Sequence, residues 1–205
     1  MSEPEMTSRL SEPSELVDLA RYPIDDLDSP KAQRLIADCR AALEAESCCV
    51  LPGFVTPKAT AAMGAEANAL APLAYHLGGR VNAYRTEDDP SFPPDHPRRI
   101  FFKSCEGNVA YDQIPDEVSI KRLYRWEAMP RFLAAVFGYE ALYRFEDPFQ
   151  AINILSWGEG DDLAWHFDMN EFTVTLLFQE PEGGGDFEFV PHIRSRSDEN
   201  YDAVT

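Results

Sequence analysis

The chain has 205 residues, of which 44% are hydrophobic and 12% aromatic, enough to build the core of a single domain. Asp and Glu number 36 against 18 Lys and Arg, and the resulting net charge of −18 at pH 7 repels nucleic acid and anionic membranes. The sequence holds no apolar run of about 20 residues, the length that spans a bilayer, and residues 1–10 lack the pattern of a secretion signal. We therefore expect a cytoplasmic protein without a nucleic-acid or membrane partner. Its acidic surface serves solubility or attracts a cationic small substrate.

The chain carries four cysteines, and two of them, Cys48 and Cys49, are adjacent. This spacing fits neither a CxxC redox pair nor a zinc knuckle. In a cytoplasmic protein the thiols stay reduced, so we expect inert buried cysteines rather than disulfides.

The first third of the chain predicts helices after a loose start. Residues 1–29 combine prolines with acids and serines and predict a flexible acidic lead-in, with one short helix near residues 14–20. From 30 to 46 the apolar residues recur at helical spacing, with Ser29 as the N-cap and a proline in the first turn. Residues 48–51 then predict a short buried strand.

A second helix, rich in alanine, is predicted from Thr56 to about Leu77, where two glycines end it. Prolines make residues 80–118 irregular, because a run of prolines forbids a long regular element. Two short strands are expected within this segment, at 81–84 and 100–103.

A third helix is predicted over 119–137, and Pro130 within it predicts a kink or a division into two shorter helices. After residue 148 the pattern changes to β-rich runs separated by glycine turns. These runs are 150–157, 163–168, 172–179 and 187–190. Short strands at close spacing indicate an antiparallel sandwich or barrel. The fold class is therefore α+β, with a helical part over 30–147 and a β-barrel part over 148–205.

His166 and Asp168 are the residues that suggest chemistry. In a strand, residues two apart point to the same face, so an imidazole and a carboxylate would lie side by side. This pair is two-thirds of the facial triad of non-haem iron oxygenases, which leave other positions open for cosubstrate and oxygen. The alternative is a simple hydrogen-bonded His–Asp pair.

The residues around this pair have a recognisable order. A strand and the glycine turn at Gly160 precede His166-Phe167-Asp168, an apolar strand follows at 172–179, and a glycine-rich strand with Asp186 and Phe189 comes last. This order resembles the double-stranded β-helix core of iron(II)/2-oxoglutarate-dependent oxygenases of the prolyl-hydroxylase-like type. The resemblance implies N-terminal helices packed on a jelly-roll, cupin-like barrel, with Fe(II) and 2-oxoglutarate as cofactors.

Three upstream segments, 82–84, 95–99 and 110–115, are similar to the branch of free-amino-acid hydroxylases and halogenases, over roughly 30–202. Halogenases of that branch replace the carboxylate ligand by a small residue, whereas Asp168 keeps it here. The resemblance therefore implies hydroxylation of a small molecule such as a free amino acid, including a basic one. O2 is consumed, and succinate and CO2 are the co-products.

Five neighbouring residues are further candidates. Asn153 and Trp157 share a strand face and by resemblance bind 2-oxoglutarate; otherwise Trp157 belongs to the core and Asn153 pairs with the backbone. Glu171 pairs with a basic substrate or is a solvated loop acid. Arg98 and Arg99 lie in the proline-rich segment. Either this segment is a lid over the site and the two arginines bind a substrate carboxylate, or they are ordinary surface residues.

The chain departs from the family pattern at its end. The family requires a second histidine and a basic residue for 2-oxoglutarate on later strands, and the only later histidine here, His192, is not expected to be the third ligand. The predicted strands are about half of the eight in a jelly roll. We expect a truncated or fragmentary oxygenase domain over 30–205, or one completed by a partner.

Two other function classes remain open. The first is a degenerate, non-catalytic oxygenase-like binding protein, or an inactive fragment that lacks the distal histidine. The second is a zinc hydrolase that uses His166 and Asp168, for which the sequence holds neither an HExxH motif nor a Cys/His cluster.

Overall fold

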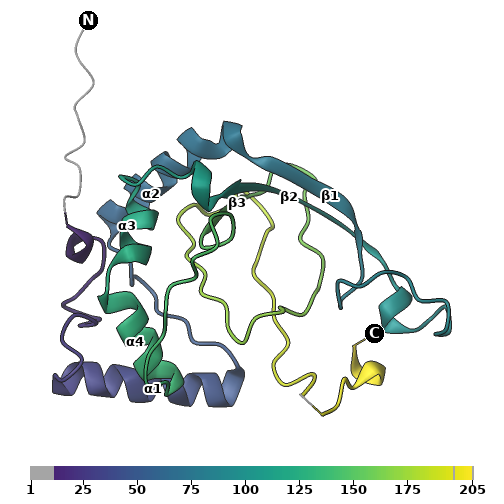
Figure 1. Cartoon of the computed structure of the whole chain (residues 1–205), viewed down its shortest axis with the longest axis horizontal. Helices are drawn as coiled ribbons and strands as arrows, with labels where there is room; N and C mark the ends of the chain where they lie inside the picture. The colour runs from purple at the N-terminus through teal and green to yellow at the C-terminus, as the bar shows by residue number, and fades with distance from the viewer. Residues whose placement is uncertain (1–11, 196, 205) are drawn as a thin grey trace, which may run out of the picture.

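The computed structural model describes residues 12–195 and 197–204 as an α+β fold in which helices flank an arched antiparallel sheet (Figure 1). The elements are α1 (Pro30–Glu46), α2 (Pro57–Leu70), β1 (Tyr75–Val81), β2 (Phe102–Ala110), α3 (Ser119–Arg125), α4 (Ala128–Phe137) and β3 (Asn153–Ser156). Five short 3-10 helices accompany them: η1 (Pro13–Glu15), η2 (Ala71–Leu73), η3 (Pro97–Arg99), η4 (Tyr111–Gln113) and η5 (Tyr201–Ala203). No helix in these described ranges is long and apolar enough to cross a membrane.

The first two helices begin where the sequence predicts. The Ser29 hydroxyl accepts a hydrogen bond from the Ala32 N–H at 3.2 Å, and the Thr56 hydroxyl accepts one from the Ala59 N–H at 3.3 Å. Each side chain satisfies a backbone donor of the first turn, which has no partner within the helix. The predicted end of the second helix near Leu77 is wrong, because α2 ends at Leu70. Pro72 cannot continue an α-helix, so the chain passes through η2 into β1.

The third predicted helix is divided in two, as its internal proline indicated. Trp126 has extended backbone between α3 and α4. Pro130 is the third residue of α4, within the first turn, where a missing N–H costs little. Gly138 ends α4 with a φ of +75°, a conformation that glycine adopts without a Cβ penalty.

The predicted flexible lead-in is wrong for residues 12–29, because this segment forms part of the main core. Leu16 is fully buried and Ile24 is 1% exposed. The Asp18 N–H donates to the Phe54 carbonyl at 2.9 Å, which ties the segment to the loop before α2. The predicted short helix near 14–20 is only the single turn of η1, and residues 1–11 lie outside the described residues.

The sheet has the order β1-β2-β3, and helices α2 and α3 pack on one of its faces. Val109 on β2 and Ile154 on β3 are opposite each other and buried, and they pack with Ala67 and Leu70 of α2. The alternate residues of β2 and β3 point to the other face and stay accessible. This accessible side is the open face of the sheet.

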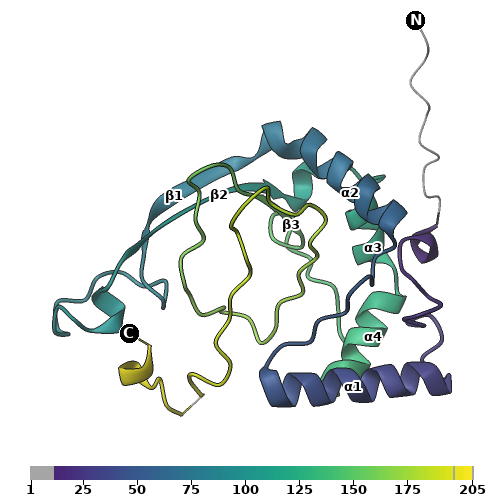
Figure 2. The same cartoon turned by 180° about the vertical axis from the view of Figure 1, so that it is seen from behind.

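Three expected strands do not form among the described residues. The segments 163–168, 172–179 and 187–190 join no ladder and run as extended loops beneath the arch of β1 and β2 (Figures 1 and 2). A single bridge pairs Cys105 with Asp162. Leu176 and Phe178 still find partners, because they pack against the main core.

Other strand predictions shift in position. The segment 48–51 is a loop. The strand expected at 81–84 instead ends at Val81, and the strand expected at 100–103 begins at Phe102. The mixed helix and antiparallel-sheet class is confirmed, and the jelly-roll barrel stays a prediction.

Candidate functional site

His166 and Asp168 lie side by side, as the sequence predicts, although they stand on a loop rather than on a strand. The His166 Nε2 atom is 3.2 Å from the Asp168 Oδ1 atom. The imidazole is largely covered, with 18% of its side chain exposed, whereas half of the Asp168 side chain is accessible. The imidazole of His166 is therefore shielded, and the carboxylate of Asp168 is open to solvent or a ligand.

Neighbouring groups orient both side chains. The His166 Nδ1 atom is 2.7 Å from the Ala164 carbonyl oxygen. Because a carbonyl only accepts, Nδ1 carries the proton and Nε2 presents its lone pair in the neutral ring. The Thr173 hydroxyl donates to Asp168 Oδ2 at 2.6 Å, which leaves Oδ1 directed at the imidazole. Supporting contacts of this kind hold the ligands of metal sites in proteins.

The backbone of the motif is anchored to the turn after β1. The Phe167 N–H donates to the Ala83 carbonyl at 2.8 Å. The Phe167 ring packs against the Tyr84 ring at a centroid distance of 5.1 Å, and the Arg194 guanidinium lies over its face at 4.0 Å. Sequence reasoning missed these contacts, since they join segments far apart in the chain.

The pair fits two positions of a divalent metal site. Two ligand atoms bonded to one ion at about 2.1 Å and at right angles lie about 3.0 Å apart, close to the separation of Nε2 and Oδ1. Within residues 12–195 and 197–204, no third His, Cys, Asp or Glu joins them in a group that could hold a metal. His192 is elsewhere, with its ring nitrogens 3.3 Å from the Ser47 hydroxyl and 3.1 Å from the Ala45 carbonyl.

The two predicted arginines have different surroundings. Arg99 pairs with Asp88 through two hydrogen bonds of 2.8 and 3.2 Å, which engages its carboxylate-binding edge. Arg98 lies over the rings of Tyr84, Phe92 and Tyr201, with its guanidinium carbon 5.3–5.9 Å from their centroids. The Tyr84 ring also packs against the Phe167 ring. Arg98 therefore belongs to the aromatic cluster that anchors the His166 loop.

This aromatic cluster contains two buried polar atoms without a hydrogen-bond partner in the described chain, the Tyr84 hydroxyl and Arg98 Nε. Burial raises the pKa of Tyr84, and the nearby Glu199 carboxylate raises it further. The phenol therefore stays protonated and remains a hydrogen-bond donor. A donor and a guanidinium together suit a carboxylate ligand.

Of the other predicted residues, Asn153 lies away from this pair, Glu171 is bonded to another residue and Trp157 is exposed. The Glu171 Oε2 atom accepts a hydrogen bond from the Tyr139 hydroxyl at 3.0 Å, beside the end of α4. Asn153 is paired with Ala110 at the last residue of β2. The Ala164 N–H instead approaches the Ser104 hydroxyl, near the start of β2, so Asn153 lies toward the opposite end of that strand. Trp157 follows β3 and is 49% exposed, which excludes a core position.

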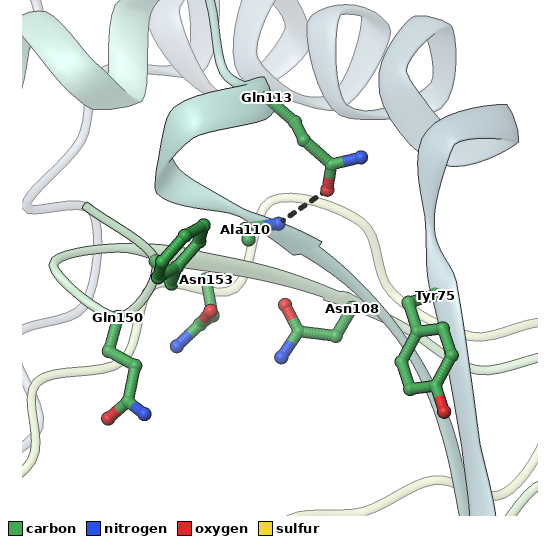
Figure 3. Close-up of a pocket in the computed structure, with 7 residues that line it drawn as sticks. Tyr75, Asn108, Ala110, Gln113, Gln150 and Asn153 are labelled. Atoms are coloured by element: carbon green, nitrogen blue, oxygen red, sulfur yellow. Dashed lines mark hydrogen bonds between the residues drawn. The ribbon is translucent and has the colours of Figure 1, made fainter.

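Asn153 instead lines a cavity of about 280 Å³ on the open face of the sheet (Figure 3). The lining residues come from β1, β2, η4, the turn before β3 and β3 itself: Tyr75, Asn108, Ala110, Gln113, Phe149, Gln150 and Asn153. The alternation of Asn108 with buried Val109 in β2 was a signal for this polar face that the sequence prediction did not use.

Comparison of the chain with protein-family models, with curated proteins and with solved structures found no match.

Proposed function

We propose that this protein is an Fe(II)/2-oxoglutarate-dependent oxygenase that hydroxylates a small molecule, with a free amino acid as the substrate class. The observation that carries the proposal is the 3.2 Å approach of His166 Nε2 to Asp168 Oδ1, with the second atom of each group held by a neighbour. The order of motifs around the pair, from Gly160 to Phe189, supports the same family.

His166 and Asp168 would hold the metal in this proposal. Bound iron would supply the redox chemistry that couples loss of CO2 from 2-oxoglutarate to C–H hydroxylation, with one oxygen atom of O2 going to the substrate and the other to succinate. Ala164 and Thr173 fix the orientation of the two ligands.

The cluster beside the His166 loop supports a carboxylate-bearing small molecule as the substrate class. Arg98 and the Tyr84 hydroxyl offer donors for a carboxylate, and their buried atoms lack other partners among the described residues. Because Asp168 keeps its carboxylate at the position that a halide would need, hydroxylation is favoured over halogenation.

A non-catalytic oxygenase-like binding protein is the second candidate. The direct contact between the two side chains favours it, because an ion pair satisfies both groups without a metal. Metal binding separates the two candidates.

The test is anaerobic titration of the full chain with Fe(II) and 2-oxoglutarate, followed through the visible metal-to-ligand charge-transfer band. We expect the band in the wild type, its loss in His166→Ala, and its retention in the control His192→Ala, whose ring is bonded to α1. Absence of the band from the wild type, or its persistence in His166→Ala, would refute the iron assignment.

A further inference from the structure

The open face of the sheet carries a second site, independent of the His166 pair. Tyr75 of β1 is opposite Asn108 of β2, and Ala110 of β2 is opposite Asn153 of β3, so all three strands contribute to one end of this face. A cavity of about 280 Å³ lies there, over the face that the helices leave uncovered. Its size is close to the lower limit of small-molecule pockets.

The cavity is lined by carboxamides and carries no Asp, Glu, Lys, Arg or His. Figure 3 shows the side chains of Asn108, Gln150 and Asn153 projecting to the same side of the sheet as Tyr75. The lining side chains are therefore uncharged, in a chain whose net charge is −18. A neutral site favours an uncharged ligand, since an ion would lose its hydration without gaining a counter-charge.

The carboxamides have unused hydrogen-bonding capacity. The Asn108 Oδ1 atom is buried and has no hydrogen-bond partner within the described residues. Gln113 is different, because its side chain already bonds the Ala110 N–H and the Leu73 carbonyl, and Figure 3 places it on the far side of the strand. A carboxamide both donates and accepts, and a hydroxyl group does the same.

Two aromatic rings flank the amides. Tyr75 is 69% exposed and Phe149 is 58% exposed, so each ring presents area that nothing in the described chain covers. The backbone of Phe149 is held in place, since its N–H donates to the Asp147 carboxylate at 2.7 Å. The negative face of an aromatic ring attracts the positively polarised C–H groups of a ligand.

We propose that this cavity binds an uncharged polyhydroxylated ligand of monosaccharide size. The hydroxyl groups around a sugar ring exchange hydrogen bonds with amides that come from separate strands and turns. The C–H faces of the sugar pack against the flanking aromatic rings. The site lies toward the opposite end of β2 from the His166 loop, so its ligand needs neither iron nor the proposed oxygenase activity.

The experiment is a titration of the metal-free full chain by calorimetry and ligand-detected NMR. The probes are glucose, mannose and myo-inositol, with gluconate as an anionic counterpart and adenosine as a planar neutral ligand. We expect at least one neutral polyol to bind with a Kd in the range of about 1 mM and gluconate to bind at least about tenfold more weakly.

Substitutions test whether the ligand binds in this cavity. Gln150 and Asn153 are exposed, so Gln150→Ala and Asn153→Ala should fold normally and lower the affinity about fivefold each, as expected for one lost hydrogen bond. Asn170→Ala, an exposed amide outside the cavity, is the matched control and should leave binding unchanged. The proposal is overturned by no polyol binding, by wild-type affinity in both cavity variants, or by adenosine binding more tightly than every polyol.

Discussion

Replacement of Asn82 by alanine should be among the most destabilising single changes in the turn that anchors the His166 loop. The Asn82 side chain is fully buried. Its Nδ2 group donates to the carbonyls of Thr86 and Arg98 at 2.9 and 2.6 Å, and its Oδ1 atom accepts from the N–H groups of Tyr84 and Thr86 at 3.0 and 3.1 Å. Alanine removes these four bonds, together with the contacts to the Thr86 hydroxyl, and leaves the backbone partners without them.

The magnitude follows from these four bonds. At a net value of about 1 kcal/mol each, Asn82→Ala should lower the free energy of unfolding by about 4 kcal/mol. Asn82→Asp keeps the two accepting bonds and loses the two donating ones, so it should lower that free energy by at least about 2 kcal/mol. Because the adjacent Ala83 carbonyl accepts from the Phe167 N–H, the alanine variant should also weaken the iron binding proposed at His166.

Urea unfolding followed by circular dichroism measures both variants against the wild type, and titration with Fe(II) tests the site. Gln33→Ala is a suitable control, because its exposed side chain makes one hydrogen bond to the Leu27 carbonyl. A loss of less than about 1 kcal/mol in Asn82→Ala, with an unchanged urea slope, would show that this hydrogen-bonded turn contributes little to stability.

Two further predictions concern the helical half. Gly138→Ala should lower the free energy of unfolding by about 1 kcal/mol, because φ is +75° there while nothing lies within 4 Å of the added Cβ. Gly79→Ala, which is equally open and has no positive φ, is its control in thermal unfolding, and equal losses would contradict the backbone argument. Burial first, and then the Cys49 thiol, raises the pKa of Cys39 from 9.0 to about 12. The protonated thiol therefore stabilises the fold fully below pH 9, and stability should fall as pH rises from about 9 through 12. Urea unfolding from pH 7 to 10.5 should show this decline, and Cys39→Ala should flatten it. Iodoacetamide at pH 8 should leave Cys39 unmodified in the folded protein, and rapid native labelling would contradict its burial.

Local signals were sufficient for the helix starts and for the division of the third helix. Ser29 and Thr56 are N-caps whose hydroxyls reach donors three residues away, so tertiary packing is not needed to place them. The end of α2 at Leu70 could also have been predicted from the sequence, since Pro72 forbids the next helical turn. The glycines at 78 and 79 were misread as a helix end, because glycine also occurs within strands, and both lie in β1.

The sequence by itself determined the α+β class, because local patterns specify helices and strands. It also predicted the proximity of His166 to Asp168, although the strand from which this was inferred does not form. Only the tertiary structure decided that residues 16–24 belong to the core, that Asn153 lines a cavity distant from His166, and that Arg98 rather than Arg99 joins the aromatic cluster. Those outcomes depend on which distant segments meet. Contacts between Val17 and Val55, or between Phe167 and Ala83, join parts of the chain whose own sequences do not specify their partners.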